Sequence, residues 1–479
     1  MSEDNTTNPF TSQSRIFGMK SAVPGMLVAF APAGSVTVDR CLVPASFTIG
    51  RSSACDLPIY DDKISKRHLV IKRSTDGFYI EDLGSTNGTF VQGVKITEPH
   101  VLPDGAVIRV GRAVLVFHAD AATLLDPPPS ERYGLAGRFH TGPLIRSMRE
   151  AARSSRHVLL VGPSGSGKEL AAHALAQLLG APGQPLHLLA HNAARFSSEE
   201  EAASTLFGVG PRVFSGVDPR PGLIEQAADG ALFLDEIHNL PTRVQRTLLR
   251  VIEDGKLARI GETRERAANT RFVLASNAPE PEFGLAHDLL ARLCVVPIPP
   301  LHERTADIPE IFNHILTSAF EHRRMSASLI IPLLSGDHFE ALCLDGFANS
   351  NVRGLVDLAD RIASRIATGV NPAETVTSVF GERFGNGPVA RRFLKSAPPG
   401  ENAPPLSRPP VSIAPNDAEE SNQNTSHYEV NRKAIEAAYF ECKGNLSATE
   451  RLLRSQGIRC SRRWIGIFAN KWDLKSSAQ

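Results

Sequence analysis

Cysteine is scarce and scattered in this chain of 479 residues, which has six cysteines and no CxxC pair. Cysteines so dispersed predict neither a zinc site nor a disulfide framework, and they fit a reducing, cytoplasmic setting. No run of about 18 apolar residues occurs, so no transmembrane helix is expected. The first twenty residues also lack the basic start and apolar stretch of a secretory signal.

Neither sign of charge dominates the whole chain, because 52 Lys and Arg face 51 Asp and Glu, a formal net charge of +1. The tail differs: ten basic side chains against four acidic ones give Val430–Gln479 a net charge of +6. The remaining 42 basic and 47 acidic side chains leave the rest of the chain at −5. The charge pattern therefore points to a nucleic-acid partner for the tail alone.

Apolar residues make up 42% of the chain and charged residues 22%, which excludes a wholly disordered or collagen-like protein. The length suits about three domains. Changes in composition and in Gly and Pro content divide the chain further. The expected segments are a disordered polar leader (1–22), an all-β sandwich (23–120), a linker (121–132), an α/β core (133–307), a helical lid (308–385), a Pro-rich linker (386–428) and an all-α tail (429–479).

Short apolar runs bounded by turns predict the strands of the first two folded segments. In the sandwich the expected strands are Met26–Phe30, Val36–Val38, His68–Lys72, Phe78–Glu81, Val107–Val110 and Val114–Phe117. In the α/β core the expected buried parallel strands are Val158–Val161, Leu186–Ala190, Ala231–Leu234 and Arg271–Ser276.

A glycine-rich segment follows the first of these parallel strands and reads Gly162-Pro163-Ser164-Gly165-Ser166-Gly167-Lys168. A helical run begins directly after it, at Glu169. Such a loop turns its backbone N–H groups toward phosphate, the helix dipole adds to the attraction, and Lys168 supplies a cation. A Gly/Ser turn with a solvated lysine is the alternative, and the flanking strand and helix argue against it.

A pair of carboxylates, Asp235 and Glu236, ends another expected strand. One member of such a pair suits Mg²⁺ held through water, and the other suits activation of an attacking water. Alone, the two acids would equally suit the cap of the next helix. Beside a phosphate-binding loop they favour ATP hydrolysis.

Residues 133–370 resemble the AAA+ ATPase domain of sigma-54-dependent transcription activators, the bacterial enhancer-binding proteins. The resemblance rests on Gly162–Leu170, Leu206–Gly208, Leu223–Glu236, Gln245–Val251, Ala275–Asn277, Asp288–Leu293, Pro299–Ile308 and Asn351–Arg353. It implies an ATPase that works as a ring, a hexamer, and glutamate after the loop lysine is usual in that family.

The resemblance also implies a role for each matching residue. Lys168 would bind phosphate, Asp235 would hold Mg²⁺, Glu236 would activate water, Asn277 would sense the γ-phosphate, Asn192 would switch with Glu236, Arg292 would be an arginine finger from a neighbouring subunit, and Arg353 would be the lid arginine. Each arginine could instead form a surface or lid salt bridge.

Two departures from the family pattern concern its coupling to sigma-54. The remodelling loop, normally GAFTGA, aligns with Arg212–Val217, where Phe214, Ser215 and Gly216 keep the expected sigma-54 contacts and arginine replaces the first glycine. The first of the family's two interface arginines falls on Ala286. An arginine finger is worth about 10³–10⁵ in rate in other NTPases, so its loss bears on hydrolysis or its control.

The sandwich segment contains the blocks Thr48–Arg51, Ser65–His68 and Asp82–Thr89. An arginine, a hydroxyl and an amide on loops at one end of a sandwich suit a phosphate and its neighbouring backbone. The blocks resemble a forkhead-associated (FHA) domain, a phosphothreonine reader. The resemblance implies phosphate contacts from Arg51, Ser65 and Lys66, support from Thr86, and a grip on the peptide backbone from Asn87. Alone, Asn87-Gly88 would equally mark a hairpin turn.

The basic tail contains three expected helices, Ala434–Glu441, Leu446–Leu453 and Ser461–Lys471. Two helices joined by a short turn, with an arginine-rich last helix, suit a helix-turn-helix whose final helix enters the major groove. The segment resembles the Fis-type helix-turn-helix of sigma-54 activators. Arg462, Arg463 and Lys471 are the expected DNA contacts, and a basic oligomerisation bundle is the alternative.

Taken together, these features predict a multidomain fold: an all-β FHA sandwich, an α/β P-loop ATPase with a helical lid, and an all-α helix-turn-helix. The predicted function is a cytoplasmic transcription regulator that reads phosphothreonine and uses ATP and Mg²⁺ to remodel sigma-54 RNA polymerase, with its tail on enhancer DNA. The alternative is a phosphopeptide-gated DNA-binding regulator whose ATPase is slow or not coupled to sigma-54.

Overall fold

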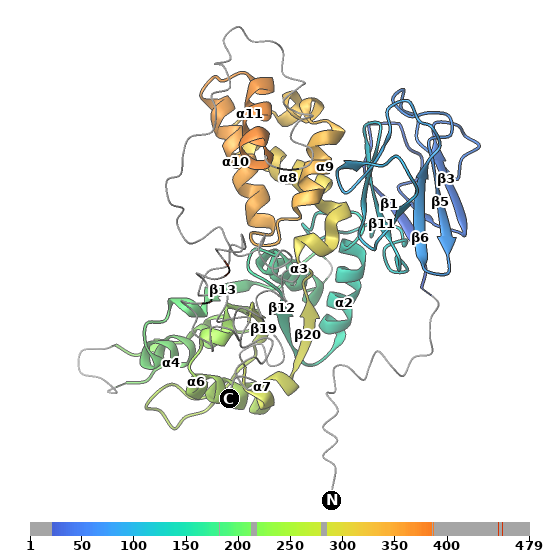
Figure 1. The fold of residues 1–479 in the computed structure, drawn as a ribbon. Coiled ribbons are helices and arrows are strands. Elements are labelled where there is room, and N and C mark those ends of the chain that lie inside the picture. The colour runs from blue at the N-terminus through green and yellow to red at the C-terminus, as the bar shows by residue number, and fades with distance from the viewer. Residues whose placement is uncertain are drawn as a thin grey trace, which may run out of the picture. The chain divides into compact units, whose positions relative to one another are not determined.

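The computed structural model describes residues 22–181, 183–211, 218–278, 285–385 and 387, together with Thr449 and Leu453 (Figure 1). The chain forms two compact units, Met1–Pro399 and Gly400–Gln479. The first unit contains the sandwich, the α/β core and the lid. Among the described residues, no helix has the length and apolar character needed to cross a membrane.

The sandwich consists of two antiparallel-rich sheets packed face to face. The first sheet has the order β2-β1-β11-β10-β7-β8. Its strands are β1 (Gly25–Phe30), β2 (Arg40–Leu42), β7 (Thr89–Val91), β8 (Val94–Lys95), β10 (Val107–Val110) and β11 (Ala113–His118). The second sheet, in the order β4-β3-β5-β6-β9, consists of β3 (Ser46–Gly50), β4 (Leu57–Pro58), β5 (Leu69–Ser74), β6 (Gly77–Asp82) and β9 (His100–Val101).

One expected strand of the sandwich is wrong: residues 36–38 form no strand, and the ladder with β1 begins only at Arg40, which faces Leu27. The reason lies in the turn before it. Ser35 donates its N–H to the carbonyl of Pro32 at 3.0 Å and accepts the N–H of Tyr60 at 2.7 Å. These bonds tie Ser35 into a loop, so the ladder starts later.

The α/β core contains a parallel sheet in the order β13-β16-β19-β12-β20. Its strands are β12 (His157–Val161), β13 (Leu188–Asn192), β16 (Ala231–Asp235), β19 (Arg271–Ser276) and β20 (Leu293–Pro297). The strand expected at Leu186–Ala190 starts two residues later, because the N–H of Leu186 bonds the carbonyl of Ala176 at 3.1 Å and closes the preceding helix.

Helices cover both faces of this sheet. Successive strand residues face opposite ways, and both sets are apolar, so each face packs against helices. Leu159, Leu232 and Leu274 join one buried cluster, and Val158, Phe233 and Val273 join another. The helices are α2 (Thr141–Arg153), α3 (Lys168–Leu179), α4 (Glu199–Phe207), α5 (Leu223–Gln226), α6 (Thr242–Asp254) and α7 (His287–Ala291), with the 3₁₀ turns η1 (Ala193–Arg195) and η2 (Ile237–Asn239). Two small hairpins add β14 (Gly208–Val209) with β15 (Arg220–Pro221), and β17 (Lys256–Leu257) with β18 (Arg266–Ala267).

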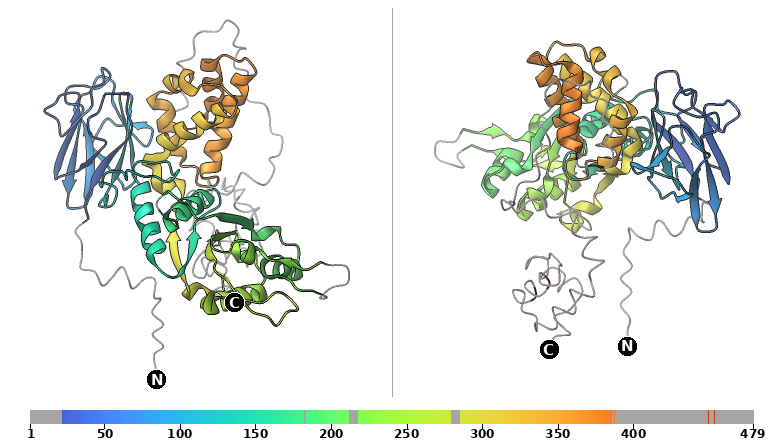
Figure 2. Two further views of the ribbon diagram at one scale, coloured as in Figure 1. Left: turned by 180° about the vertical axis from the view of Figure 1, so that it is seen from behind. Right: turned by 45° about the horizontal axis from the view of Figure 1, so that its top comes forward.

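The lid follows β20 and is helical throughout its described length. Its elements are η3 (Leu301–Asp307), α8 (Ile308–Glu321), η4 (Ala327–Leu329), η5 (Ile331–Leu333), α9 (Gly336–Asp345), α10 (Val352–Ala367) and α11 (Pro372–Phe384). Both views in Figure 2 show the sandwich beside the lid helices. Ala121 and Leu124 of the expected linker 121–132 are buried in the same apolar cluster as the lid, so this segment is packed.

Candidate functional site

The glycine-rich loop lies between β12 and α3, where the order of the parallel sheet reverses. Its backbone runs too close to other backbone for side chains: a Cβ on Gly162 would lie 2.5 Å from the carbonyl oxygen of Ile298, and one on Gly165 would lie 2.7 Å from that of Ser350. Gly167 precedes α3 with φ 100°, a left-handed conformation. The free N–H groups at the start of α3 therefore face the loop.

Lys168, the first residue of α3, is 8% exposed. Its Nζ donates to the carbonyl oxygens of Gly162 at 2.8 Å and Pro163 at 3.0 Å. Burial lowers the pKa of Lys168, while the nearby charges of Asp235 and Glu236 act in the opposite direction. Both hydrogen-bond acceptors are neutral, so the ammonium charge at this position suits an anion such as a phosphate group.

Asp235 and Glu236 stand at the end of β16, as the sequence predicts. Glu236 has φ 53°, a left-handed conformation that is unusual for a residue with a side chain. Its N–H donates to Oδ1 of Asp235 at 2.9 Å, and its Oε2 accepts from Nδ2 of Asn239 at 3.2 Å. Strained backbone of this kind clusters at functional sites. Sequence reasoning missed Asn239, which lies only three residues from Glu236.

The two asparagines expected at the site stand at the ends of β13 and β19, the strands on either side of β16. Asn192 ends β13 directly opposite Asp235 in the parallel register. Its Oδ1 accepts the N–H of Ala194 at 2.8 Å, so Asn192 begins the η1 turn. Asn277 follows β19 and lines a cavity of about 610 Å³ together with Gly162 and Pro163 of the glycine-rich loop.

The start of α10 in the lid contacts the glycine-rich loop directly. Nδ2 of Asn351 donates to the carbonyl of Ser164 at 3.0 Å, and the N–H of Val352 donates to that of Gly165 at 3.0 Å. Arg353 Nη1 donates to Oγ of Ser164 at 2.8 Å. The structure therefore brings the expected lid arginine to the loop, through a hydroxyl.

Two buried residues of η3, Arg304 and Asp307, also hold this region and were not predicted. Arg304 donates from Nη2 to the carbonyl of Ser166 at 2.7 Å. Asp307 accepts the N–H groups of Phe139 at 2.8 Å and His140 at 3.0 Å, and also Nδ1 of His140 at 3.0 Å. Burial alone would raise the pKa of Asp307, but the interactions with His140 and the backbone lower it. Both residues lie in the segment Pro299–Ile308 that carried the family resemblance, which was the available signal.

The three signature loops of the sandwich meet at one of its ends. The N–H of Arg51 bonds the carbonyl of Ser65 at 2.9 Å, and Oγ of Ser65 accepts the N–H of Thr86 at 3.2 Å. Nδ2 of Asn87 donates to the carbonyl of Lys63 at 2.7 Å. The structure thus brings together residues that are separated by up to 36 positions (Arg51 to Asn87).

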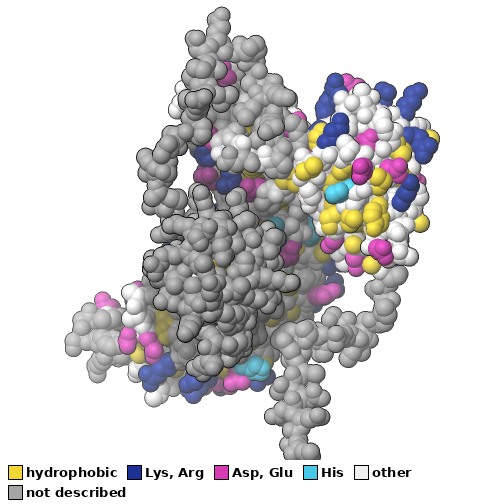
Figure 3. Space-filling view, in the orientation of Figure 1, with side chains coloured by type: hydrophobic (Ala, Val, Ile, Leu, Met, Phe, Trp, Pro, Cys, Tyr) yellow, Lys and Arg dark blue, Asp and Glu magenta, His cyan; other side chains and the backbone are white. Residues whose placement is uncertain are grey.

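Exposed cations surround this end of the sandwich. Arg51 and Lys66 are exposed, and within the described part of the chain neither forms an ion pair. Figure 3 shows Lys and Arg side chains gathered at the rim of the sandwich. Behind the loops, buried His68 accepts the N–H of Ser65 at Nδ1 (3.1 Å), and its Nε2 lies 3.3 Å from the carbonyl of Gly88. Burial lowers the pKa of His68, which fits a neutral ring joining two loops.

Comparison with known proteins identifies both parts. The family model of the sigma-54 interaction domain matches residues 139–299, and that of the FHA domain matches residues 47–111. The Psp operon transcriptional activator of Escherichia coli K12 is 34% identical over 245 residues, covering 49% of this chain and 72% of that protein. The chain belongs to the family of sigma-54-dependent transcription activators.

Other relatives are longer than the shared region. NtrC of Escherichia coli K12 is 37% identical over 241 residues, covering 48% of this chain and 50% of that protein. The nitric oxide reductase transcription regulator NorR1 of Cupriavidus necator is 40% identical over 172 residues, covering 34% and 33%. The chain therefore spans half or less of these two relatives. Among solved structures, NtrX of Brucella abortus has 22% identity and a TM-score of 0.44, covering 72% of this chain and 70% of that one.

Family membership makes the α/β core with its lid an AAA+ domain, in which Arg292 and Ala286 stand at the positions expected for two family arginines. Arg292 directly follows α7 with 59% of its side chain exposed, and its Nε lies 3.0 Å from Oε1 of Glu253. A single exposed ion pair of this kind holds a side chain weakly. Ala286, at the position of the first of the two family arginines, precedes α7 and donates its N–H to Oε1 of Gln245 at 3.2 Å.

Several predicted contacts of this activator lie outside the described residues and stay predictions: Phe214, Ser215, Gly216, Arg462, Arg463 and Lys471. The chain on either side of the remodelling segment is described, and β14 and β15 pair there with Gly208 opposite Pro221 and Val209 opposite Arg220. This hairpin holds the two ends of the segment together.

The described residues of the site offer Mg²⁺ only a small number of protein ligands. The family usually has glutamate after the loop lysine, and Glu169 is exposed in the first turn of α3. Within the described residues there is no group of three or more His, Cys, Asp or Glu side chains that could hold a metal. Mg²⁺ keeps several waters and commonly takes one or two protein carboxylates plus substrate phosphates. Asp235, at the end of β16, can supply such a carboxylate.

Proposed function

We propose that this activator reads phosphothreonine through its FHA domain and uses ATP hydrolysis to remodel sigma-54 RNA polymerase at enhancer-dependent promoters. One observation carries the proposal: the charges of Asp235 and Glu236 act on buried Lys168 at the end of the glycine-rich loop, and Arg353 of the lid donates to Ser164 of the same loop. This set provides cations for phosphates and a base for water on a rigid sheet edge.

ATP binding follows from the loop and its neighbours. The N–H groups at the start of α3 and the Nζ of Lys168 would bind the phosphates, exchanging the carbonyl oxygens of Gly162 and Pro163 for phosphate oxygens. A second cavity of about 120 Å³ adjoins the loop between core and lid, lined by apolar side chains that include Leu135, Ile315 and Val352. This cavity would take the adenine ring.

Hydrolysis would use Glu236 as the general base: it would accept a proton from the attacking water as the water oxygen bonds to the γ-phosphorus and the bond from that phosphorus to the β–γ bridging oxygen breaks, which releases ADP. Asn239 would orient the Glu236 carboxylate, and Asn277 would contact the γ-phosphate from the end of β19. Bound Mg²⁺, held by Asp235, would neutralise charge on the phosphates. Arg353 would contact the same phosphates from the lid.

Assembly and targets follow from the resemblance to the family. In a hexameric ring, Arg292 would exchange Glu253 for the γ-phosphate of a neighbouring subunit. Phe214, Ser215 and Gly216 would contact sigma-54. Arg462, Arg463 and Lys471 of the basic tail would hold enhancer DNA, with the protein in the cytoplasm. A phosphothreonine protein would bind Arg51, Ser65 and Lys66, with Thr86 and Asn87 fixing its backbone.

A second candidate function is a phosphopeptide-gated DNA-binding regulator whose ATPase is slow or acts on another target. The sequence observations that favour it are Ala286 in place of an interface arginine and Arg212 in place of the first loop glycine. The two candidates differ in whether the ring engages sigma-54 during hydrolysis.

The test uses the purified full chain with sigma-54 RNA polymerase, enhancer DNA and a phosphothreonine peptide pool. The proposal expects ATP turnover that Glu236→Ala abolishes, sigma-54 binding with a transition-state analogue, and promoter opening that rises with the peptides. Normal turnover without any sigma-54 binding or promoter opening would favour the second candidate. Turnover that survives Glu236→Ala would contradict the assigned base.

A further inference from the structure

In the first sheet of the FHA sandwich, the adjacent strands β1 and β11 are buried on both faces. In β11, Leu115 and Phe117 point into the core of the sandwich, while Val114 and Val116 belong to a second apolar cluster that includes the lid. β1 alternates in the same way, with Val28 inward and its neighbours outward. An antiparallel sheet with one solvated face has polar residues on it. Here that face is apolar because the lid covers it.

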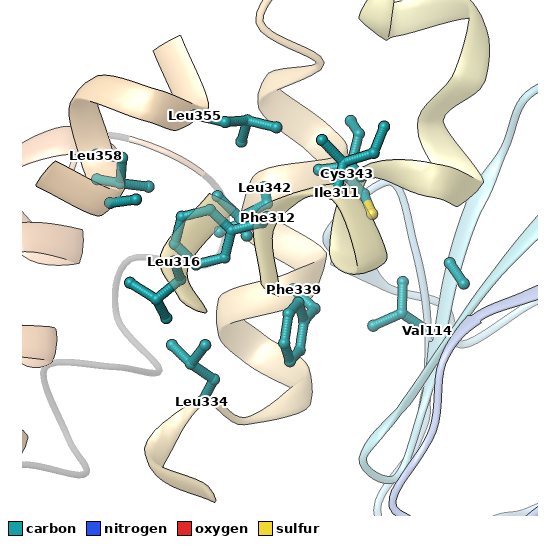
Figure 4. Close-up of a cluster of buried hydrophobic side chains, with 14 of the residues drawn as sticks. Val114, Ile311, Phe312, Leu316, Leu334, Phe339, Leu342, Cys343, Leu355 and Leu358 are labelled. Atoms are coloured by element: carbon teal, nitrogen blue, oxygen red, sulfur yellow. The ribbon is translucent and has the colours of Figure 1, made fainter. Parts of the chain in front are cut away.

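The lid meets this face with α9. The ring of Phe339 stacks on that of Phe30 of β1, with centroids 4.1 Å apart and planes inclined by 29°. Figure 4 shows Phe339 between Val114 of the sandwich and the lid side chains Leu334 and Leu342. All of these except Phe30 are buried. The FHA domain and the lid therefore share one hydrophobic core.

An ion pair crosses the same contact. Nε of Arg109 in β10 lies 2.9 Å from Oε2 of Glu340 and 3.5 Å from Oδ1 of Asp337, both on α9. The guanidinium also lies 4.1 Å from the ring centre of Phe90. Glu340 is fully buried, so the carboxylate depends on this partner for charge compensation. Beside it Gly336 leaves no space: a Cβ there would lie 2.3 Å from the carbonyl oxygen of Arg112.

The hairpin that contacts α9 also supports the predicted phosphopeptide loops. Buried Asp61 accepts the N–H of Arg112 at 2.9 Å and the N–H of Lys63 at 3.1 Å. The carbonyl of Lys63 in turn accepts Nδ2 of Asn87. The Asp61 carboxylate thus links Lys63, in the loop beneath the predicted phosphopeptide site, to Arg112, in the turn that contacts Gly336.

On its other side, α9 leads directly to the nucleotide site. It ends at Asp345, and only six residues separate it from Val352, whose N–H bonds the glycine-rich loop. Within those six, the N–H of Asn351 bonds the carbonyl of Phe347 at 2.6 Å, and Phe347 is buried in the shared core. Because the connection is short and is held by this bond, a displacement of α9 also displaces Asn351 and Arg353.

We propose that the FHA domain and the lid form one rigid body, and that phosphopeptide occupancy acts on the nucleotide site through the contact of β10 and β11 with α9. The inference rests on the proposed function, since it concerns the regulation of the same ATP site. Because coupling between two sites is reciprocal, each ligand must change the affinity of the other by the same factor, typically about 5- to 150-fold.

The test measures both affinities on the full chain by titration. The probes are a degenerate pool of phosphothreonine peptides, with its unphosphorylated pool as blank, and a non-hydrolysable ATP analogue. For the wild type we expect each ligand to change the affinity for the other by the same coupling factor, of at least about fivefold.

Two variants separate docking from binding. Val114→Asp places a charge on the outward face of β11, away from the core of the sandwich, and Glu340→Gln removes the ion pair from the lid side. Each should keep the affinity for the single ligands within about twofold of wild type and bring the coupling factor close to one. The matched controls are Val101→Asp, at a position 54% exposed on β9, and Glu374→Gln, at an exposed position on α11. Both controls should keep the wild-type factor.

The outcomes distinguish the two proposals. A wild-type chain that binds both probes with a coupling factor of one would overturn this inference and leave the proposed function standing. Wild-type coupling retained in both Val114→Asp and Glu340→Gln would also overturn it. Failure of the wild type to bind the ATP analogue or the phosphorylated pool would overturn the proposed function, and the inference with it.

Discussion

Asn239 donates a hydrogen bond from Nδ2 to Oε2 of Glu236 across 3.2 Å. The contact matters because Glu236 sits in a left-handed backbone conformation at the end of β16, and this hydrogen bond orients its carboxylate. Asn192, which the family pattern assigns to the partnership with Glu236, bonds Ala194 in this structure.

Asn239→Ala should lower the rate of ATP hydrolysis about three- to tenfold and leave nucleotide affinity unchanged, because an exposed hydrogen bond to a carboxylate orients it at modest energy. Glu236→Gln should lower the rate about 100-fold or more, as expected for loss of a general base. Steady-state kcat and KM check both. Asn269→Ala, at another exposed loop position, is the control. A raised KM with unchanged kcat in Asn239→Ala would contradict the orienting role.

Lys168→Ala should weaken binding of ATP at least about 100-fold, equivalent to about 2.7 kcal/mol, because it removes the buried cation of the glycine-rich loop. Fluorescence titration with a labelled ATP analogue measures the change. Lys256→Ala removes an exposed lysine that pairs with Glu265 and should leave the affinity unaltered. Equal affinities for the two variants would rule out the phosphate role of Lys168.

Arg51→Ala should reduce the affinity for phosphothreonine peptides about tenfold or more, because it removes an exposed cation whose backbone is bonded to Ser65. Fluorescence anisotropy with phosphorylated and unphosphorylated peptide pools measures the loss. Arg73→Ala is the matched change on β5, where the guanidinium covers the ring of Phe78. If Arg51→Ala kept the preference for phosphorylated peptides, the site would have to lie elsewhere.

The lid should lose stability as the pH falls below 6.5, through His338. Burial lowers the pKa of His338 from 6.5 to about 4, with a smaller opposing effect from Asp337. Its Nδ1 accepts the N–H of Ser335 at 3.0 Å, which requires the neutral ring. Between about pH 6.5 and 4 the unfolded chain binds a proton that the folded chain does not, so the free energy of unfolding decreases with falling pH.

His338→Gln tests this contribution, since glutamine can also complete a capping box but does not titrate. Between pH 7.5 and 5 the wild type should lose about 2 kcal/mol more than the variant, measured from urea unfolding midpoints. The exposed His100→Gln should behave as wild type. An equal loss in wild type and His338→Gln would refute the assignment.

The sequence predicts the parts of the site that are local in the chain. The glycine-rich loop lies between a strand and a helix as expected, and the Asp235-Glu236 pair ends its strand, because close approach to phosphate restricts residue types at fixed spacing. Likewise the three blocks of the FHA domain are recognised one by one, and the structure joins them at Ser65.

The remainder depends on contacts between distant segments. Arg304 bonds Ser166 from 138 positions away, and Asp307 bonds Phe139 across 168 positions, so the family resemblance marks their segment but does not give their partners. The strand expected at Val36–Val38 fails because Tyr60 ties Ser35 into a loop. One long-range feature did have a local signal: the unbroken apolar run of β11, which an antiparallel strand shows only when both faces are covered.

The doubly buried sheet also constrains how such a protein can be divided or recombined. A fragment ending near residue 120 would expose Leu27, Val114 and Val116 to water as a continuous apolar surface, which favours aggregation. Exchange of this FHA domain for another would require an outer face that fits α9. The lid and the FHA domain are therefore expected to be inherited together, as a matched pair.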